Sequence, residues 1–247
     1  MKISYLTLFP SFYDQFKSTS IIKNAIMNNK ISIDTIDLKD FVKKGRVDSK
    51  IVSGGKGNLI RYDVVSEALN SVRTDKSKVI LVTPKGRVFN QQLANELKNE
   101  EELIFICPHF EGIDERIVSE VDYSLSIGDY ILSGGELASQ VISDAVIRLV
   151  DGVINKDSLK EETFNDDLLE YSQYALPRVY NGKAIPDIYF SGNHKAIEEY
   201  KIKDSLLITK KNRPDLYKKH KLSEKEKKIL AKCDKNWEKK IIEKSKK

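Results

Sequence analysis

The fold of this chain is decided by the stretch Ser126-Ile127-Gly128-Asp129-Tyr130-Ile131-Leu132-Ser133-Gly134-Gly135-Glu136. It follows an apolar segment and precedes a run, Leu137–Leu149, in which apolar residues recur at helical spacing. The order of strand, glycine-bearing loop and helix is typical of α/β proteins, in which ligands bind beyond the carboxyl ends of the strands. Because Gly134 and Gly135 lack side chains, a ligand can approach their backbone N–H groups closely.

Two further loops of this kind come earlier in the chain. Thr83-Pro84-Lys85-Gly86 follows the apolar run Val79–Val82, and the loop that begins with Phe110-Glu111-Gly112 follows Leu103–Cys107. Apolar strands separated by helices predict a parallel sheet covered on both faces. Each loop alone is explained by a tight turn or a charged helix start, but together the three predict one ligand site. None has the glycine pattern of a dinucleotide site or a P-loop.

Periodicity and turn residues place the other elements. Strands are predicted at Lys2–Leu8 and Ile31–Ile36, and helices at Phe12–Met27, Tyr62–Val72 and Gln91–Leu97. The polar, acidic residues 155–167 have no periodicity, which predicts a linker. Ser223 followed by Glu226 forms a capping box that predicts the start of a last helix, with an apolar stripe continuing through Cys233, Trp237 and Ile241.

Charge is distributed unevenly along the 247 residues, whose formal net charge is +5. Residues 195–247 hold 19 basic and 9 acidic residues, a net charge of +10, whereas residues 1–194 hold 23 basic and 28 acidic, a net charge of −5. Such an asymmetry is typical of proteins that bind a polyanion such as nucleic acid. A solvated lysine-rich helical surface explains the charge equally well.

Other features favour a cytoplasmic protein. No run of eighteen apolar residues is present, so no membrane span is predicted. The first ten residues lack the length and cleavage site of a signal peptide and are predicted to form a strand instead. Cys107 and Cys233 lie far apart without a CxxC motif, which suggests neither a zinc site nor a disulfide framework.

Two motifs resemble the signatures of the bacterial tRNA (guanine-37-N1)-methyltransferases, which are trefoil-knot (SPOUT-type) enzymes. They are Phe110-Glu111-Gly112-Ile113-Asp114-Glu115-Arg116 and the opening stretch, residues 126–136. Shorter similarities extend over nearly the whole chain: Leu8-Phe9-Pro10, the glycine loop 54–57, Pro84-Lys85-Gly86-Arg87, Leu168-Leu169, Ser191-Gly192-Asn193-His194 and Arg213-Pro214. The eleven-residue run is long enough to make this resemblance specific.

The resemblance implies an α/β fold with a parallel sheet and a deep knot threaded within residues 80–150, followed by a small helical domain. Residues 1–154 would form the knotted cofactor-binding domain, 155–175 the linker that carries the base, and 176–247 a basic tRNA-binding domain. S-adenosylmethionine would lie in the knot, contacted by Thr83, Pro84, Pro108, Glu111, Gly112, Ile127, Gly128, Asp129, Tyr130, Ile131, Leu132, Gly134 and Gly135.

The chemistry of the implied reaction assigns two further residues. Guanine N1 carries a proton and is a poor nucleophile at neutral pH, so its methylation needs a general base. A cation near O6 stabilises the negative charge that develops there. The resemblance implies that Glu162 is the base and that Arg148 stabilises O6. On composition alone, Glu162 is one linker acid among many and Arg148 a solvent-facing helix residue.

The resemblance also implies the partners. The family acts as a homodimer that shares its active sites between two chains, and it depends on Mg²⁺, for which no ligand residues are predicted. Residues that would contact tRNA are Gly54, Gly55, Gly57, Asn193, His194 and Arg213. His109 and His220 have no comparable support.

The sequence departs from the family at several functional positions. Glu162 replaces an aspartate, Pro108-His109 replaces Gly-Arg, and Leu176 replaces an arginine. Misplacing a base by about 1 Å costs on the order of a hundredfold in rate, so these changes bear on rate and tRNA selectivity. Two alternatives therefore stay open: a knotted methyltransferase with another RNA target, and a non-catalytic RNA-binding relative.

Overall fold

A computed structural model of the chain describes residues 1–155 and 168–232. The chain divides into two compact units, Met1–Lys156 and Asp157–Lys247. Because residues 156–167 and 233–247 are not described, the expected base, Glu162, lies outside the described residues, as do Cys233, Trp237 and Ile241.

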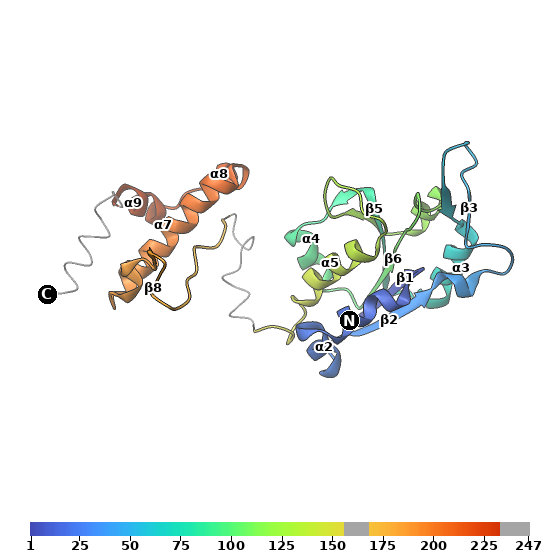
Figure 1. The fold of residues 1–247 in the computed structure, drawn as a ribbon, viewed down its shortest axis with the longest axis horizontal. Coiled ribbons are helices and arrows are strands. Elements are labelled where there is room, and N and C mark those ends of the chain that lie inside the picture. Colours follow the sequence, from blue (N-terminus) through green and yellow to red (C-terminus); the bar gives the residue numbers. More distant parts are fainter. Residues whose placement is uncertain (156–167, 233–247) are drawn as a thin grey trace. The chain divides into compact units, whose positions relative to one another are not determined.

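The first unit is built on a five-stranded sheet with the order β2-β1-β6-β5-β7, and every pair of neighbouring strands is parallel (Figure 1). This confirms the parallel sheet predicted from the apolar runs. The strands are β1 (Lys2–Thr7), β2 (Ser32–Asp37), β5 (Ser77–Val88), β6 (Glu102–Ile106) and β7 (Tyr123–Ser126).

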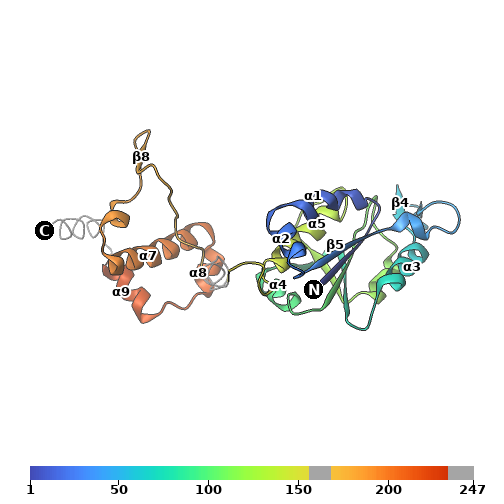
Figure 2. The same ribbon diagram turned by 90° about the horizontal axis from the view of Figure 1, so that it is seen from below.

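Helices cover both faces of this sheet, because successive side chains of a strand point to opposite faces (Figure 2). Helix α3 (Tyr62–Val72) packs its buried valines and Leu69 on one face, against Leu6 and Ile104. Helix α5 (Glu136–Ile147) covers the other face, where the Tyr5 hydroxyl donates to Ser143 Oγ at 2.7 Å. Helix α4 (Gln91–Leu97) packs beside α5.

The single helix predicted over Phe12–Met27 is wrong, because the chain breaks at Thr19. The segment forms η1 (Pro10–Tyr13), α1 (Asp14–Ser18) and α2 (Ser20–Met27). Thr19 is extended, with φ −103° and ψ 131°, and its hydroxyl donates to the Gln15 carbonyl oxygen at 2.6 Å. A threonine side chain that bonds the preceding turn competes with continuation of the helix.

The polar stretch after β2 holds a short helix and a hairpin that periodicity did not predict. They are η2 (Leu38–Phe41) and the antiparallel strands β3 (Asp48–Lys50) and β4 (Asn58–Ile60). Asp48 is buried at the base of the hairpin and accepts hydrogen bonds from Arg46 and Asn58. The Arg46 guanidinium holds the pKa of the Asp48 carboxyl below its usual value.

Strand β5 extends beyond the predicted end at Val82 and returns to the same partner. Val82 and Arg87 both pair with Leu125 of β7, with a register shift between them. A Cβ on Gly86 would lie 2.5 Å from the Leu125 backbone nitrogen, so a side chain has no room there. Residues 83–86 are therefore an irregular part of β5, across which the pairing with β7 shifts its register.

The second unit contains a β8–β9 hairpin followed by helices. Its elements are β8 (Val179–Tyr180), β9 (Lys183–Ala184), η4 (Asp187–Phe190), α7 (His194–Asn212), α8 (Pro214–Lys219) and α9 (Glu224–Lys232). The predicted capping box is present: Glu226 N–H donates to Ser223 Oγ at 3.3 Å, and Ser223 N–H donates to Glu226 Oε2 at 2.6 Å. Among the described helices, none is both long and apolar enough to cross a membrane.

Candidate active site

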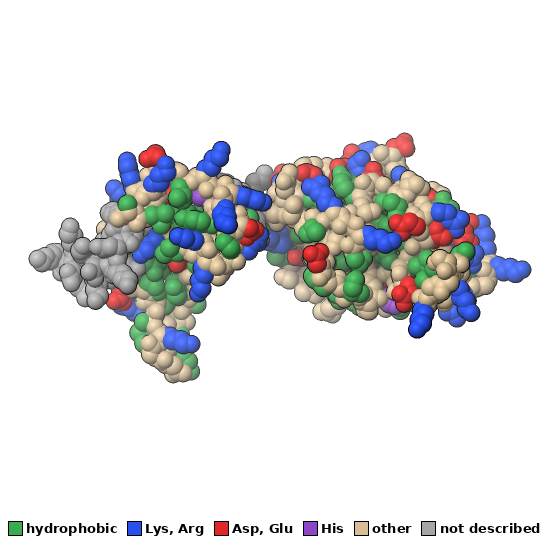
Figure 3. All heavy atoms as spheres, turned by 90° about the horizontal axis from the view of Figure 1, so that it is seen from above, with side chains coloured by type: hydrophobic (Ala, Val, Ile, Leu, Met, Phe, Trp, Pro, Cys, Tyr) green, Lys and Arg blue, Asp and Glu red, His purple; other side chains and the backbone are tan. Residues whose placement is uncertain are grey.

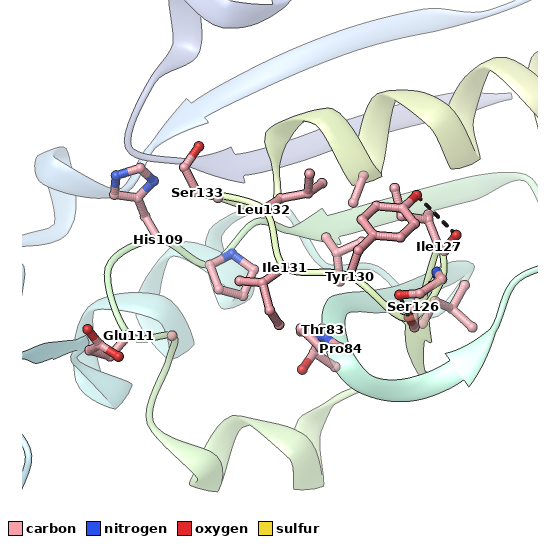
Figure 4. A pocket seen from close by; sticks show the side chains of 18 of the residues that line it. Thr83, Pro84, His109, Glu111, Ser126, Ile127, Tyr130, Ile131, Leu132 and Ser133 are labelled. Atoms are coloured by element: carbon pink, nitrogen blue, oxygen red, sulfur yellow. Dashed lines mark hydrogen bonds between the residues drawn. The ribbon is translucent and has the colours of Figure 1, made fainter. Parts of the chain in front are cut away.

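The three predicted loops meet at a cavity of about 300 Å³, which lies beyond the carboxyl ends of β6 and β7 and beside residues 82–84 of β5. Figure 4 shows Glu111 and Tyr130 at opposite ends of the view, with Ile131 between them. The lining residues include Thr83, Pro84, Pro108, Glu111, Gly112, Ile127, Gly128, Tyr130, Ile131, Leu132, Gly134 and Gly135. The structure thus brings together all the residues expected at the cofactor except Asp129.

Backbone contacts hold two of these loops together. His109 forms antiparallel bridges with Gly112 in its own loop and with Gly134 in the loop after β7. The Gly135 N–H donates to the Pro108 carbonyl oxygen at 2.7 Å. A Cβ on Gly135 would lie 2.9 Å from Cys107 Cα, so the two loops touch through their main chains. The cavity wall is therefore fixed before any ligand binds.

The loop after β7 closes on itself. The Tyr130 hydroxyl donates to the Ile127 carbonyl oxygen at 3.2 Å, and the Tyr130 N–H donates to the Gly128 carbonyl oxygen at 2.9 Å. Ile131 is 81% exposed although it lines the cavity. An apolar side chain held in such a position supplies a flat, water-excluding surface for a ligand.

A buried polar network fixes the start of α5 on the sheet. Glu136 is buried and accepts a hydrogen bond from the Thr7 hydroxyl at 2.9 Å. The Tyr13 hydroxyl lies 2.8 Å from Ser139 Oγ and 3.1 Å from Cys107 Sγ. Burial raises the pKa of the Cys107 thiol to about 12 and also raises the pKa of Tyr13. The Cys107 thiol and the Tyr13 hydroxyl are therefore neutral. The hydrogen bonds of this network position the helix and its preceding loop.

His109 was not assigned a role from the sequence, yet it lines the cavity. In residues 1–155 and 168–232, its Nδ1 is the one buried side-chain nitrogen or oxygen atom without a hydrogen-bond partner. Its ring lies edge-on to Phe9 and Phe110, with centroid distances of 4.8 and 5.1 Å. A buried polar atom without a partner costs free energy, which a ligand group at this position would recover. In the sequence, the position of His109 shortly after a predicted strand was the feature that could have marked it as a site residue.

The glycine loop 54–57 reaches this site through its last residue. A Cβ on Gly57 would collide with the Glu111 side chain, and the Glu111 N–H donates to the Asn58 carbonyl oxygen at 3.1 Å. Gly54, in contrast, has no atom within 4 Å of the position of a Cβ. The β3–β4 hairpin therefore lies against the cavity at Gly57, while the tip of its loop is open.

Arg148 lies at the opposite end of α5 from the cavity. It caps the carboxyl end of the helix and is half-buried, whereas Gly135 caps the amino end. Thirteen residues separate the two, which corresponds to about 20 Å along a helix axis. Within one chain, Arg148 is thus too distant to contact a ligand beside Gly135.

The tRNA-binding residues expected in the second unit lie at the ends of α7. The Asn193 side chain caps the helix by accepting from Ala196 N–H at 3.1 Å, and His194 is exposed at the first turn. Arg213 follows the helix and pairs with Asp215 at 2.7 Å. Within the described parts of the chain, no three His, Cys, Asp or Glu side chains gather in a way that could hold a metal ion.

Comparison with known proteins agrees with this arrangement. The family described as tRNA (Guanine-1)-methyltransferase TrmD matches residues 1–219. A tRNA (guanine-N(1)-)-methyltransferase of Malacoplasma penetrans (strain HF-2) is 46% identical over 222 residues, which cover 89% of this chain and 98% of that protein. One of Ureaplasma urealyticum serovar 10 is 48% identical over 223 residues, with the same coverage.

A tRNA (guanine-N(1)-)-methyltransferase of Clostridium botulinum (strain Loch Maree / Type A3) is 45% identical over 234 residues, which cover 93% of this chain and 97% of that protein. These proteins match along nearly their whole length, and the family match includes every loop of the cavity. The chain therefore belongs to the tRNA (guanine-1)-methyltransferase TrmD family.

Proposed function

We propose that this protein methylates N1 of guanosine 37 in tRNA, with S-adenosylmethionine as the methyl donor. The observation that carries the proposal is the cavity formed by three post-strand loops, in a chain that belongs to a tRNA (guanine-1)-methyltransferase family. Residues 1–154 bind the cofactor, residues 155–175 form the linker with the base, and residues 176–247 bind tRNA. Residues 80–150 form the knot, a proposal supported by the pairing of both Val82 and Arg87 of β5 with Leu125 of β7.

The cavity fits the proposed cofactor. Its apolar wall, Pro84, Ile131 and Leu132, suits an aromatic base, and the unpartnered Nδ1 of His109 suits a polar group. Gly134 and Gly135 line the cavity and have no side chains that would fill it. When bound, S-adenosylmethionine supplies an electrophilic methyl group. Asp129 is the one expected contact residue that does not line the cavity, and we propose a contact through its backbone.

Two side chains act on the guanine. Glu162 accepts the N1 proton, which leaves the N1 lone pair free for the new bond to carbon. The Arg148 guanidinium stabilises the negative charge that develops at O6. Glu162 lies outside the described residues, so its assignment rests on the resemblance of the linker sequence.

A homodimer places Arg148 where this chemistry needs it. Because Arg148 and Gly135 are about 20 Å apart along α5, we propose that each cavity receives its arginine from the second chain. Large apolar side chains on one side of the first unit support such an interface: Phe9, Phe12, Leu137 and Val141 are 42–51% exposed. Gln140 on α5 donates to the Phe12 carbonyl oxygen at 3.1 Å, which joins these residues into one surface.

The proposed tRNA contacts come from the second unit and, separately, from the β3–β4 hairpin of the first unit. Gly54, Gly55 and Gly57 form an open loop beside Glu111, and His194 is exposed at the start of α7. Asn193 and Arg213 already make local bonds, so they act by shaping the ends of α7. The expected Mg²⁺ finds no fitting cluster of side chains in the described residues, and no step is assigned to it.

One assay tests the proposed function. Purified protein is incubated with labelled S-adenosylmethionine, Mg²⁺ and tRNA transcripts that carry G or A at position 37. Label on the G37 transcript alone supports the proposal. Label on both transcripts indicates a knotted methyltransferase with another RNA target, and binding of tRNA without label indicates a non-catalytic relative.

A further inference from the structure

The second unit contains a cavity of about 450 Å³ that the proposed reaction does not use. It is formed by the segment before the β8–β9 hairpin and by η4. The lining residues are Tyr171, Ser172, Gln173, Tyr174, Leu176, Ile185, Tyr189 and Phe190. Four of these eight side chains are aromatic, which is an unusual lining for a polar surface.

Two of the four aromatic rings of this cavity are exposed to solvent, and the other two are partly buried. Tyr174 is 48% exposed and Phe190 is 44% exposed. The Tyr174 and Tyr189 ring centroids are 5.6 Å apart, and Tyr189 meets Tyr200 of α7 edge-on at 5.5 Å. Rings that are held by one edge and exposed on the other can stack with a planar ligand.

Cations lie against the same rings. The Arg178 guanidinium carbon is 4.3 Å from the Phe190 ring centroid, and Lys201 Nζ is 4.6 Å from that of Tyr171. Residues 168–232 hold 15 basic and 8 acidic residues, a net charge of +7. Figure 3 shows hydrophobic side chains gathered where the hairpin leaves this unit, with Lys and Arg side chains around them. Arg178 also pairs with Asp187 at 2.7 Å, and Lys201 pairs with Glu198 at 3.5 Å. Aromatic rings with cations beside them are the combination that suits a planar ligand with negative charge.

The cavity is formed in advance by hydrogen bonds to α7. Leu169 N–H donates to Thr209 Oγ1 at 2.8 Å, Ser205 Oγ donates to the Leu169 carbonyl oxygen at 2.6 Å, and Ser172 N–H donates to Asp204 Oδ2 at 2.7 Å. Burial raises the pKa of Tyr189 to about 12, so its ring is neutral at physiological pH. A preformed wall reduces the entropy that a ligand must overcome on binding.

We propose that this aromatic cavity binds one unstacked base of the tRNA, distinct from the methylated guanosine. The inference rests on the proposed function for the identity of the RNA. Aromatic rings and flanking cations together match a base and its phosphate, which is how single-stranded nucleic acids are bound without sequence readout. A second copy of this chain is the competing occupant, and the experiment below separates it from RNA.

The test compares Tyr174→Leu/Phe190→Leu with Tyr174→Phe and with Tyr217→Leu as the matched control. Tyr217 is also an aromatic residue of this unit beside a lysine, with Lys210 Nζ 5.7 Å from its ring, but it does not line the cavity. The dissociation constant for the tRNA transcript is measured at two salt concentrations, and the affinity for S-adenosylmethionine is measured separately.

We expect the double leucine variant to bind tRNA about tenfold more weakly, because each base–aromatic stack contributes substantially to affinity. Its salt dependence and its affinity for S-adenosylmethionine should match the unmodified protein, and Tyr174→Phe should bind tRNA normally. Leucine keeps an apolar surface but has no ring for stacking. The double variant should therefore weaken the binding of a base more than it would weaken the binding of a protein partner.

Three results would overturn the inference: tRNA affinity within twofold of the unmodified protein, an equal loss in Tyr217→Leu, or a change of oligomeric state in the double variant. The last would show that a second copy occupies the cavity. This experiment measures binding of tRNA and not methylation. If the protein binds tRNA but leaves guanosine 37 unmethylated, the proposed function is refuted, and the binding measurements on the variants still test the cavity.

Discussion

Gly86 of β5 lies against the backbone of Leu125 in β7 so closely that a Cβ on Gly86 would sit 2.5 Å from the Leu125 nitrogen. Val82 and Arg87 pair with the same Leu125 on either side of this point. The approach is between main chains, so no side-chain rotation can relieve a clash. The pairing of β5 with β7 shifts its register here, and Thr83 and Pro84 of the same irregular part of β5 line the cavity.

Gly86→Ala should therefore destabilise the whole first unit. We expect a loss of about 3 kcal/mol or more in the free energy of unfolding, at the upper end of what overpacking costs. Unfolding in urea measures this free energy for both proteins. Gly54→Ala is the control, because no atom lies within 4 Å of its Cβ position and only its positive φ of 80° is strained. Equal stability of the two variants would contradict this close approach of the two main chains.

Gly134→Ala should weaken cofactor binding without unfolding the protein. Its Cβ would lie 2.7 Å from His109 Nδ1 and would also collide with the Glu136 carboxylate, at the wall of the cavity. We expect at least a tenfold loss of affinity for S-adenosylmethionine, measured by calorimetry. Gly55→Ala, whose Cβ would meet only the Ile51 side chain at 3.2 Å, should bind the cofactor normally. Normal binding by Gly134→Ala would place the cofactor elsewhere.

Arg148→Met should be inactive alone but active in mixed dimers. In a dimer of this variant with Gly134→Ala, one cavity has an intact wall and receives Arg148 from the other chain. Random mixing should restore about a quarter of the normal turnover, because half of the dimers are mixed and each has one intact site. An absence of restored activity in dimers shown to be mixed would mean that Arg148 serves its own chain.

Glu162→Gln should lower turnover by about a hundredfold or more, the range of a lost general base. The amide keeps the shape of the carboxylate but cannot accept the N1 proton. The neighbouring Glu161→Gln is the control, and single-turnover kinetics measures the chemical step. If Glu162→Gln turns over normally, the proton goes to another group, such as Asp166 or Asp167.

The Cys107 thiol should be unreactive in the folded protein. Burial raises its pKa to about 12, so at pH 8 only about one thiol in ten thousand is a thiolate, the reactive form. In Cys233→Ser, alkylation by iodoacetamide at pH 8 should be negligible until urea unfolds the chain. Rapid alkylation without urea would show that the network of Tyr13, Ser139 and Cys107 opens in solution.

Elements with strong periodicity could be predicted from the sequence. The helices at Tyr62–Val72 and Gln91–Leu97 have the predicted bounds, because each buries one apolar stripe. The break at Thr19 depends on a single side-chain hydrogen bond, which periodicity does not detect. Helix α7 was not identified, because its lysines and apolar residues do not separate into two faces.

The cavity could be predicted in outline because loops after parallel strands converge on one edge of the sheet. The continuation of β5 past Val82 could not be predicted, because Pro84 and Gly86 are typical of turns. In the structure, pairing with β7 overrides that preference. His109 lies between Pro108 and the predicted Glu111, and its unpartnered nitrogen becomes apparent only when Gly134 is packed beside it.

The proposed activity is methylation of one atom of one nucleotide, which mass spectrometry of the product can identify. After reaction, the tRNA transcript is digested and the methylated nucleoside is identified and mapped. We expect 1-methylguanosine in the fragment that contains position 37, and none when that position carries A. A methyl group on another nucleotide, or on another atom of guanosine 37, would contradict it.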